Sequence, residues 1–250
     1  MAPSRLLASW LLCLAPVFAN PVTVKWTDWI SGSPSGGTAS GVINTGSSTV
    51  AVSYLNPQGY AFLQTGTGID YFQNHLGAAG SPFTSSVVAN IPTAAEMIGL
   101  HHAGNQTLVF SETIANPFFS YISLNGNGYA FDRDFDILSF GSSTDPEGPN
   151  YNGYWGHGTS FKQIVNLPGG GIEYQLLGTG EPHGTIRFRG AFNSVSWRSL
   201  SNEYWNGFTV GVEGTAAQVF GTPDGANMTT LLGLAGGFLV LLRRRQAGRR

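Results

Sequence analysis

The 250-residue chain has almost no cysteine and little charge. Its single cysteine is Cys13, and its only lysines are Lys25 and Lys162. Charged residues make up 10% of the chain, against about 25% in ordinary proteins. A highly charged disordered chain is excluded, because 42% of the residues are hydrophobic and 12% are aromatic, enough to form a buried core.

The chain also lacks the patterns of several functional classes. Nucleic-acid binding is disfavoured, because the formal net charge is -2 and no basic patch interrupts the middle of the chain. The 35 glycines keep no period of three, which excludes collagen. The sequence contains none of the commonest signatures of metalloproteases, hydrolases and nucleotide-binding proteins: His-Glu-x-x-His, Gly-x-Ser-x-Gly and Gly-x-x-x-x-Gly-Lys-Ser/Thr.

The N-terminal residues 1–19 have the composition of a signal peptide. Arg5 supplies the positive charge, residues 6–15 form a short apolar run, and residues 17–19 form a small-x-small cleavage motif before Asn20. Cleavage by signal peptidase would remove Cys13. The exported chain would then contain no disulfide, and a hydrophobic core would have to hold it together.

The C-terminal residues 222–250 combine a short motif, an apolar run and an arginine cluster. A helix over residues 229–242 would be about 21 Å long, against a hydrocarbon core of about 30 Å. The arginines favour the cytoplasmic side, which places the preceding domain outside. The sequence thus predicts a short transmembrane helix flanked by Thr222, Pro223, Asp224 and Gly225 on one side and by Arg243, Arg244 and Arg245 on the other.

This order of motif, short helix and arginine cluster resembles the PEP-CTERM sorting signal of exopolysaccharide-producing Gram-negative bacteria. The motif Thr222-Pro223-Asp224-Gly225 departs from the Pro-Glu-Pro form and is similar to the Val-Pro-Asp-Ser/Gly variant. The resemblance implies recognition by an exosortase-type enzyme during a transient stay in the inner membrane. It also implies delivery to the outer surface or the extracellular matrix. The alternative is a permanent single-pass anchor.

Residues 20–221 are expected to form one exported domain. It carries six basic and thirteen acidic side chains, a formal charge of about -7, and should repel anionic polymers unless divalent cations bridge them. Apolar residues alternate with polar or small ones in residues 50–54, 185–189, 194–198 and 208–213, which predicts strands with one solvent-exposed face. Turns rich in Gly, Asn and Pro separate them. The pattern predicts a single antiparallel, jelly-roll-like β-sandwich, with a helix over residues 93–100.

Three aspartates spaced two residues apart suggest a calcium site. On a strand, Asp132, Asp134 and Asp136 would point to one face, and Asp145 and Glu147 follow in a loop. The alternative is a solvated strand face followed by an acidic loop.

Two groups of aromatic residues suggest a glycan-binding surface. Tyr151, Tyr154 and Trp155 lie in a segment rich in Gly and Asn, and Tyr204 and Trp205 form a second group. Aromatic planes match the C–H faces of sugar rings. The alternative is that these side chains fold back onto the sandwich as loop anchors.

The sequence therefore favours a non-catalytic matrix protein that is structural or binds extracellular polysaccharide. One alternative is a carbohydrate-active hydrolase or lyase that uses carboxylates such as Asp134 or Glu181. Another is a binding domain that stays anchored in the membrane.

Overall fold

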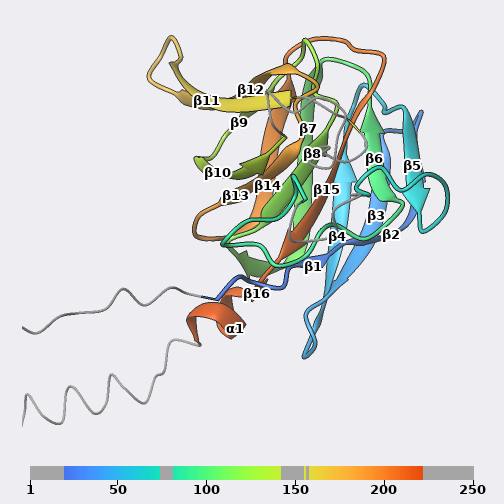
Figure 1. Ribbon diagram of the computed structural model, residues 1–250, viewed down its shortest axis with the longest axis vertical. Helices are drawn as coiled ribbons and strands as arrows, with labels where there is room; N and C mark the ends of the chain where they lie inside the picture. The colour runs from blue at the N-terminus through green and yellow to red at the C-terminus, as the bar shows by residue number, and fades with distance from the viewer. Residues whose placement is uncertain (1–19, 74–80, 142–154, 156–157, 222–250) are drawn as a thin grey trace, which may run out of the picture.

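The computed structural model describes residues 20–73, 81–141, 155 and 158–221. These residues form two antiparallel sheets packed face to face, which confirms the predicted β-sandwich (Figure 1). The predicted signal peptide, 1–19, and sorting signal, 222–250, lie outside the described residues. Within the described ranges, no helix is long and apolar enough to cross a membrane.

The strands divide between a seven-stranded and a nine-stranded sheet. The seven-stranded sheet has the spatial order β10 (Phe135–Phe140), β13 (Gly184–Phe188), β8 (Phe118–Ile122), β15 (Asn206–Val212), β6 (Glu96–Leu100) and β5 (Phe62–Thr65), with β1 (Lys25–Trp26) beside β15. The nine-stranded sheet has the order β11 (Gly158–Asn166), β12 (Ile172–Gly180), β9 (Tyr129–Phe131), β14 (Ala191–Ser199), β7 (Gly104–Ala115), β4 (Thr49–Leu55), β3 (Thr38–Asn44) and β2 (Asp28–Ser33), with β16 (Gly214–Thr215) beside β7. A short helix, α1 (Ala216–Phe220), follows β16.

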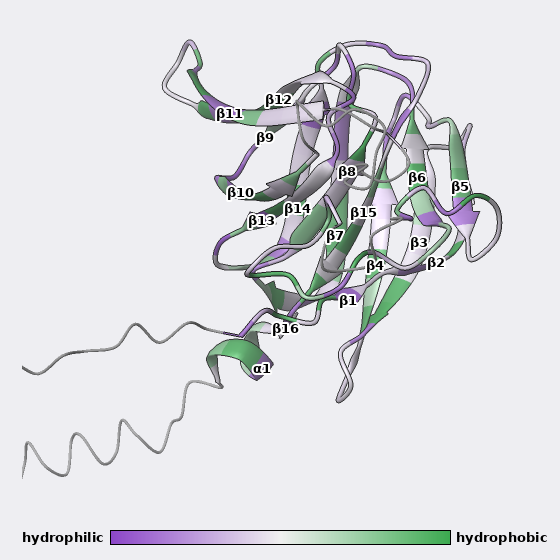
Figure 2. Cartoon of the chain, in the orientation of Figure 1, coloured by the Kyte–Doolittle hydropathy of each residue, from purple (hydrophilic) through white to green (hydrophobic). Residues whose placement is uncertain are grey.

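The predicted alternation holds where a strand has one solvent-facing side. In β4, Val50, Val52 and Tyr54 are buried, and the residues between them are exposed. In β14, Val195 and Trp197 point into the core in the same way. Figure 2 shows how apolar residues gather on the central strands of both sheets. Burial of these alternate side chains is what pairs the two sheets.

Aromatic rings fill the space between the sheets. Phe119 of β8 and Phe208 of β15 stack with ring centroids 4.9 Å apart and planes 3° apart. Trp197, from β14 in the opposite sheet, stands edge-on to both rings, with centroid distances of 5.4 Å and 5.1 Å. Offset-stacked and edge-to-face pairs are the favoured aromatic arrangements, so this contact fixes how the sheets face each other.

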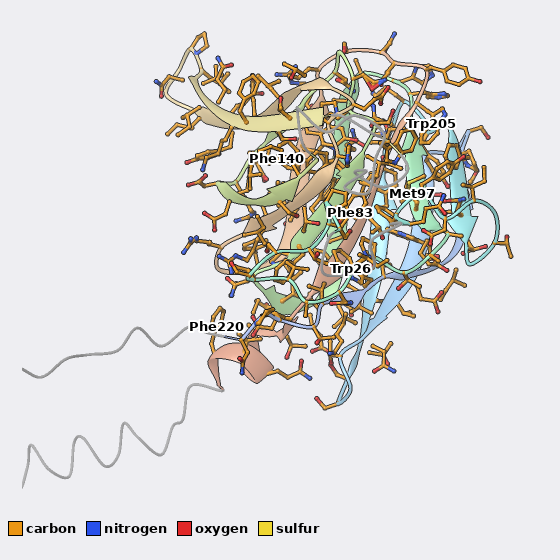
Figure 3. All side chains as sticks on the ribbon, viewed as in Figure 1. Trp26, Phe83, Met97, Phe140, Trp205 and Phe220 are labelled. Carbon is orange, nitrogen blue, oxygen red and sulfur yellow. The ribbon has the colours of Figure 1, made fainter. Side chains whose placement is uncertain are left out.

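The prediction of one wet face is wrong for β15, because all seven of its residues are buried. Residues 66–73 and 81–95 cover the outer side of the seven-stranded sheet, where Trp26, Phe83 and Met97 lie (Figure 3). A Cβ added to Gly207 would lie 2.5 Å from the sulfur of Met97 on the neighbouring strand β6. This glycine therefore marks where the Met97 side chain lies close over β15, not exposure.

The helix predicted over residues 93–100 is also wrong. Residues Glu96–Leu100 form β6, which pairs with β15 on one side and β5 on the other. Ala95, at φ 54°, turns the chain into the strand. All five residues of β6 are buried because both faces of this sheet are covered. A continuous apolar run is typical of such a strand and can be mistaken for a buried helical segment.

A buried carboxyl group on β6 links the seven-stranded sheet to β2, the last strand of the nine-stranded sheet. Glu96 of β6 is 4% exposed, and its Oε2 accepts a hydrogen bond of 2.7 Å from the backbone N–H of Trp29 in β2. Burial raises the pKa of Glu96 from 4.5 to about 7, and the negative charge of Asp28 adds to the rise. The folded protein therefore favours the protonated form of Glu96.

We expect the stability of the protein to fall as the pH rises from 5 to 8. The contribution of Glu96 is fully present below its unfolded pKa of 4.5 and is lost as the pH rises through about 7. This loss is at most about 3 kcal/mol. Glu96→Gln keeps an oxygen acceptor for Trp29 but cannot ionise, so it should remove the part of the dependence that comes from Glu96, as followed by urea unfolding at a series of pH values.

The exposed Glu112 of β7 supplies the control. Glu112→Gln should leave the pH dependence as it is in the wild type. An unchanged slope in the Glu96→Gln variant would contradict the assignment.

Candidate functional site

Four loops meet at one end of the sandwich, here called the loop end: residues 101–103, 123–128, 181–183 and 200–205. The backbone N–H of Glu203 donates to the carbonyl oxygen of His101 at 3.1 Å, and Leu124 N–H donates to Pro182 O at 3.0 Å. The side-chain oxygen of Asn127 accepts hydrogen bonds from the N–H groups of Leu200 and Ser201 at 3.0 Å and 2.9 Å. These bonds hold side chains from distant parts of the sequence together.

Glu181 is held by two donors of the 123–128 loop. Its Oε2 accepts from Ser123 Oγ at 2.9 Å, and its Oε1 accepts from Asn125 Nδ2 at 3.0 Å. Ser123 has a φ of 53°, a left-handed conformation that is uncommon for a residue other than glycine. Such backbone strain persists where the surroundings fix it, and here it directs the Ser123 hydroxyl at the carboxylate.

Glu203 is the second carboxyl group of the loop end. Its Oε2 accepts from Asn206 Nδ2 at 2.8 Å, while its Oε1 is buried without a hydrogen-bond partner among the described residues. Burial raises the pKa of Glu203 from 4.5 to about 7, the neighbouring charge of Glu181 raises it further, and hydrogen bonding from Asn206 opposes the rise. A carboxyl group poised near neutral pH can both donate and accept a proton.

The side chain of Asn206 connects the carboxyl group of Glu203 to the core. The hydroxyl of the buried Tyr129 donates to Asn206 Oδ1, and the amide of the same asparagine donates to Glu203. Burial raises the pKa of Tyr129 well above 10, so its hydroxyl keeps its proton and remains a donor. Asn206 is therefore held with its amide nitrogen toward Glu203.

The predicted aromatic residues divide between two roles. Trp205 packs edge-to-face against Phe62 and Trp155, with centroid distances of 5.1 Å and 5.4 Å. Trp155 Nε1 donates to the backbone oxygen of Tyr71 at 3.1 Å. These two tryptophans thus anchor loops onto the covered face of the seven-stranded sheet. Tyr204, by contrast, is 91% exposed. Tyr151 and Tyr154 lie outside the described residues.

The three aspartates proposed as calcium ligands do not share one strand. Asp132 and Asp134 lie in the crossing from β9 to β10, which belong to different sheets, and only Asp136 is on a strand. Asp134 pairs with Lys162 at 2.7 Å, and Asp136 pairs with Arg187 and Arg189 at 3.2 Å and 2.6 Å.

Asp145 and Glu147 lie outside the described residues. Among those that are described, no three His, Cys, Asp or Glu side chains are placed to hold a metal ion. Calcium binding stays a prediction.

Sequence reasoning named Glu181 only as one possible carboxylate and did not name Glu203, Ser123 or Asn125. The sequence Ser-Asn-Glu-Tyr-Trp-Asn at residues 201–206 held a signal, because it places polar and aromatic residues together between two strands. The electrostatic effect of Glu181 on Glu203 depends on loops that are distant in sequence. Comparisons of the chain with protein-family models, curated proteins and solved structures find no match.

We expect Trp205→Ala and Tyr204→Ala to differ sharply in stability. Trp205→Ala removes a ring packed against three aromatic neighbours and should lower the free energy of unfolding by about 2–4 kcal/mol. Tyr204→Ala removes an exposed ring and should change it by less than about 0.5 kcal/mol. Urea denaturation measures both, and equal losses in the two variants would contradict these roles.

Proposed function

We propose that the chain is an exported, surface-sorted, non-catalytic β-sandwich protein of the extracellular polysaccharide matrix of a Gram-negative bacterium, and that it binds glycan at the loop end. The observation that carries glycan binding is the exposed ring of Tyr204 next to a cluster of carboxylate and amide groups. A sugar ring needs both kinds of contact, since its C–H face packs on an aromatic plane and its hydroxyls exchange hydrogen bonds.

The charge of the domain favours a neutral glycan. Residues 20–221 carry a formal charge of about -7, which repels acidic polysaccharides at low ionic strength. The partly exposed side chain of Asn125 supplies amide donor and acceptor groups that suit uncharged hydroxyls.

The terminal segments support the route to the cell surface. Residues 1–19 suit signal peptidase, and residues 222–250 suit an exosortase-type sorting enzyme acting while the C-terminal helix is in the membrane. A permanently anchored binding domain would follow if the tail is never cut.

We also propose that the sandwich is a jelly roll. Its central strands have the order β6-β15-β8-β13 in one sheet and β7-β14-β9-β12 in the other, and the chain crosses between the sheets as it runs from β6 to β9 and from β12 to β15. This order supports two interleaved Greek keys. In that topology the loops 101–103, 123–128, 181–183 and 200–205 share one end, which agrees with the contacts at the loop end.

A second candidate function is a carbohydrate-active hydrolase or lyase. The observation that favours it is the electrostatic coupling of Glu181 and Glu203, together with a pKa of about 7 for Glu203. Two neighbouring carboxyl groups, one of them with a raised pKa, are the kind of pair that general acid catalysis of glycoside cleavage uses.

We expect the mature protein to bind at least one neutral glycan on an array. Tyr204→Ala should weaken this binding at least tenfold, about 1.4 kcal/mol, because the stacking ring is lost. Phe220→Ala is the matched control, because Phe220 is an exposed aromatic at the opposite end of the molecule (Figure 3). Equal binding by Tyr204→Ala and the wild type would show that the loop end is the wrong surface.

The same glycans test the enzyme alternative. Release of sugar by the wild type, lost in Glu203→Gln while binding is retained, would replace the non-catalytic function with the hydrolase or lyase.

We expect cleavage at both ends of the chain in its native host. Mass spectrometry of the intact protein should find a chain that begins at Asn20 and lacks Arg243–Arg250. A mature protein that still carries these arginines would favour the permanent anchor over sorting.

A further inference from the structure

The strand β11 is the outer edge of the nine-stranded sheet. It pairs with β12 over its full length, from Gly158 opposite Gly180 to Asn166 opposite Ile172, and no described strand pairs with its other side. The β11–β12 hairpin extends beyond the body of the sandwich (Figure 1). An unpaired strand edge presents a row of backbone N–H and C=O groups that another β-strand can bind.

Apolar side chains are concentrated on this hairpin. It carries four of the eleven large hydrophobic side chains that are exposed in the described residues: Phe161, Ile164, Leu167 and Ile172. Phe161 is 47% exposed and Ile164 is 56% exposed. Their positions differ by three, so they point to opposite faces of the strand. A strand added at the edge would place its own side chains beside both of them.

Most of the features that usually protect an edge strand are missing from β11. The strand contains no proline, and its pairing with β12 runs without a bulge. Its one charged residue is Lys162, whose Nζ donates to Asp134 Oδ1 at 2.7 Å and to the backbone oxygen of Phe135 at 2.8 Å. This lysine is the one charged residue of β11 that could protect the edge, and its pairing with Asp134 neutralises the charge.

We propose that β11 is a self-association edge, which pairs antiparallel with β11 of a second copy of this chain about a two-fold axis. In such a pair, residues directly opposite each other have their side chains on the same face of the sheet. The two-fold axis therefore passes midway between one residue and the same residue of the second copy. Centring on Lys162 would place two lysines opposite each other, which is destabilising. Centring on Gln163 places Phe161 opposite Val165 and Lys162 opposite Ile164, twice each.

This register favours a second copy of the chain as the source of the partner strand. The backbone edge requires a β-strand, and the sequence of β11 is complementary to itself when centred on Gln163: an aromatic ring meets a β-branched side chain and no like charges meet. The pairing joins two nine-stranded sheets into one continuous sheet. It is independent of glycan binding, because β11 contributes no residue to the cluster of carboxylate and amide groups at the loop end.

A charge reversal at one position tests the register. Ile164→Lys and Ile164→Glu remove the same apolar side chain, but only the lysine faces Lys162 of the second copy with a like charge. Analytical ultracentrifugation of the exported protein should give a dimer with a Kd below about 0.1 mM. Ile164→Lys should weaken it at least tenfold, and Ile164→Glu should keep or strengthen it.

A wild type that is monomeric at about 0.1 mM would overturn the proposal. Equal weakening by both variants would also overturn it, because it would indicate apolar association without strand pairing. No effect of either variant would place the dimer contact elsewhere.

A cross-link gives a readout that does not depend on affinity. Gln163→Cys places one thiol opposite its copy, whereas Asn166→Cys places the two thiols about 20 Å apart along the strands. The only native cysteine, Cys13, is replaced by serine in both variants. With an added mild oxidant, Gln163→Cys should form the intermolecular disulfide at least tenfold faster. Equal rates would overturn the pairing.

Discussion

The contact of Trp197 with the stacked pair Phe119 and Phe208 is the interaction on which the rest of the structure depends. Phe119 and Phe208 come from neighbouring strands of the seven-stranded sheet, and Trp197 comes from the other sheet and meets both edge-on. If the signal peptide is removed at the predicted site, no disulfide can reinforce this contact. The free energy that holds the sheets together then comes mainly from burial of apolar and aromatic surface.

The same core positions the loop end. Tyr129 packs against Phe119 with a centroid distance of 5.9 Å, and its hydroxyl reaches Asn206, which in turn holds Glu203. Glu203, whose pKa burial raises to about 7, is thus two hydrogen bonds away from Tyr129 in the core. Substitutions in the core are expected to alter this group without contacting any ligand, because the strands that carry its partners would shift.

The sandwich could be predicted from the sequence because alternation along a strand depends on local burial. Val50, Val52 and Tyr54 show this directly. The prediction was wrong where a distant segment covers a second face, as in β6 and β15 beneath residues 66–73 and 81–95. Spacing also placed Asp132 and Asp136 on one strand, although the chain crosses between the sheets there. In the candidate site, the exposure of Tyr204 and the loop-anchoring contacts of Trp205 each match one of the two alternatives that the sequence left open. The proximity of Glu203 to Glu181 could not be predicted, because it depends on contacts between distant loops.

The central strands of the seven-stranded sheet, β6, β8 and β15, are covered on both faces, while the β11–β12 hairpin is open. Native-state hydrogen exchange, read by mass spectrometry at a dilution where only monomer is present, tests this claim most directly. We expect amides of β8 and β15 to exchange only through global unfolding, and the hairpin beyond Phe161 to exchange through local opening at a much lower free energy. Exchange of β15 as fast as that of the hairpin would contradict it.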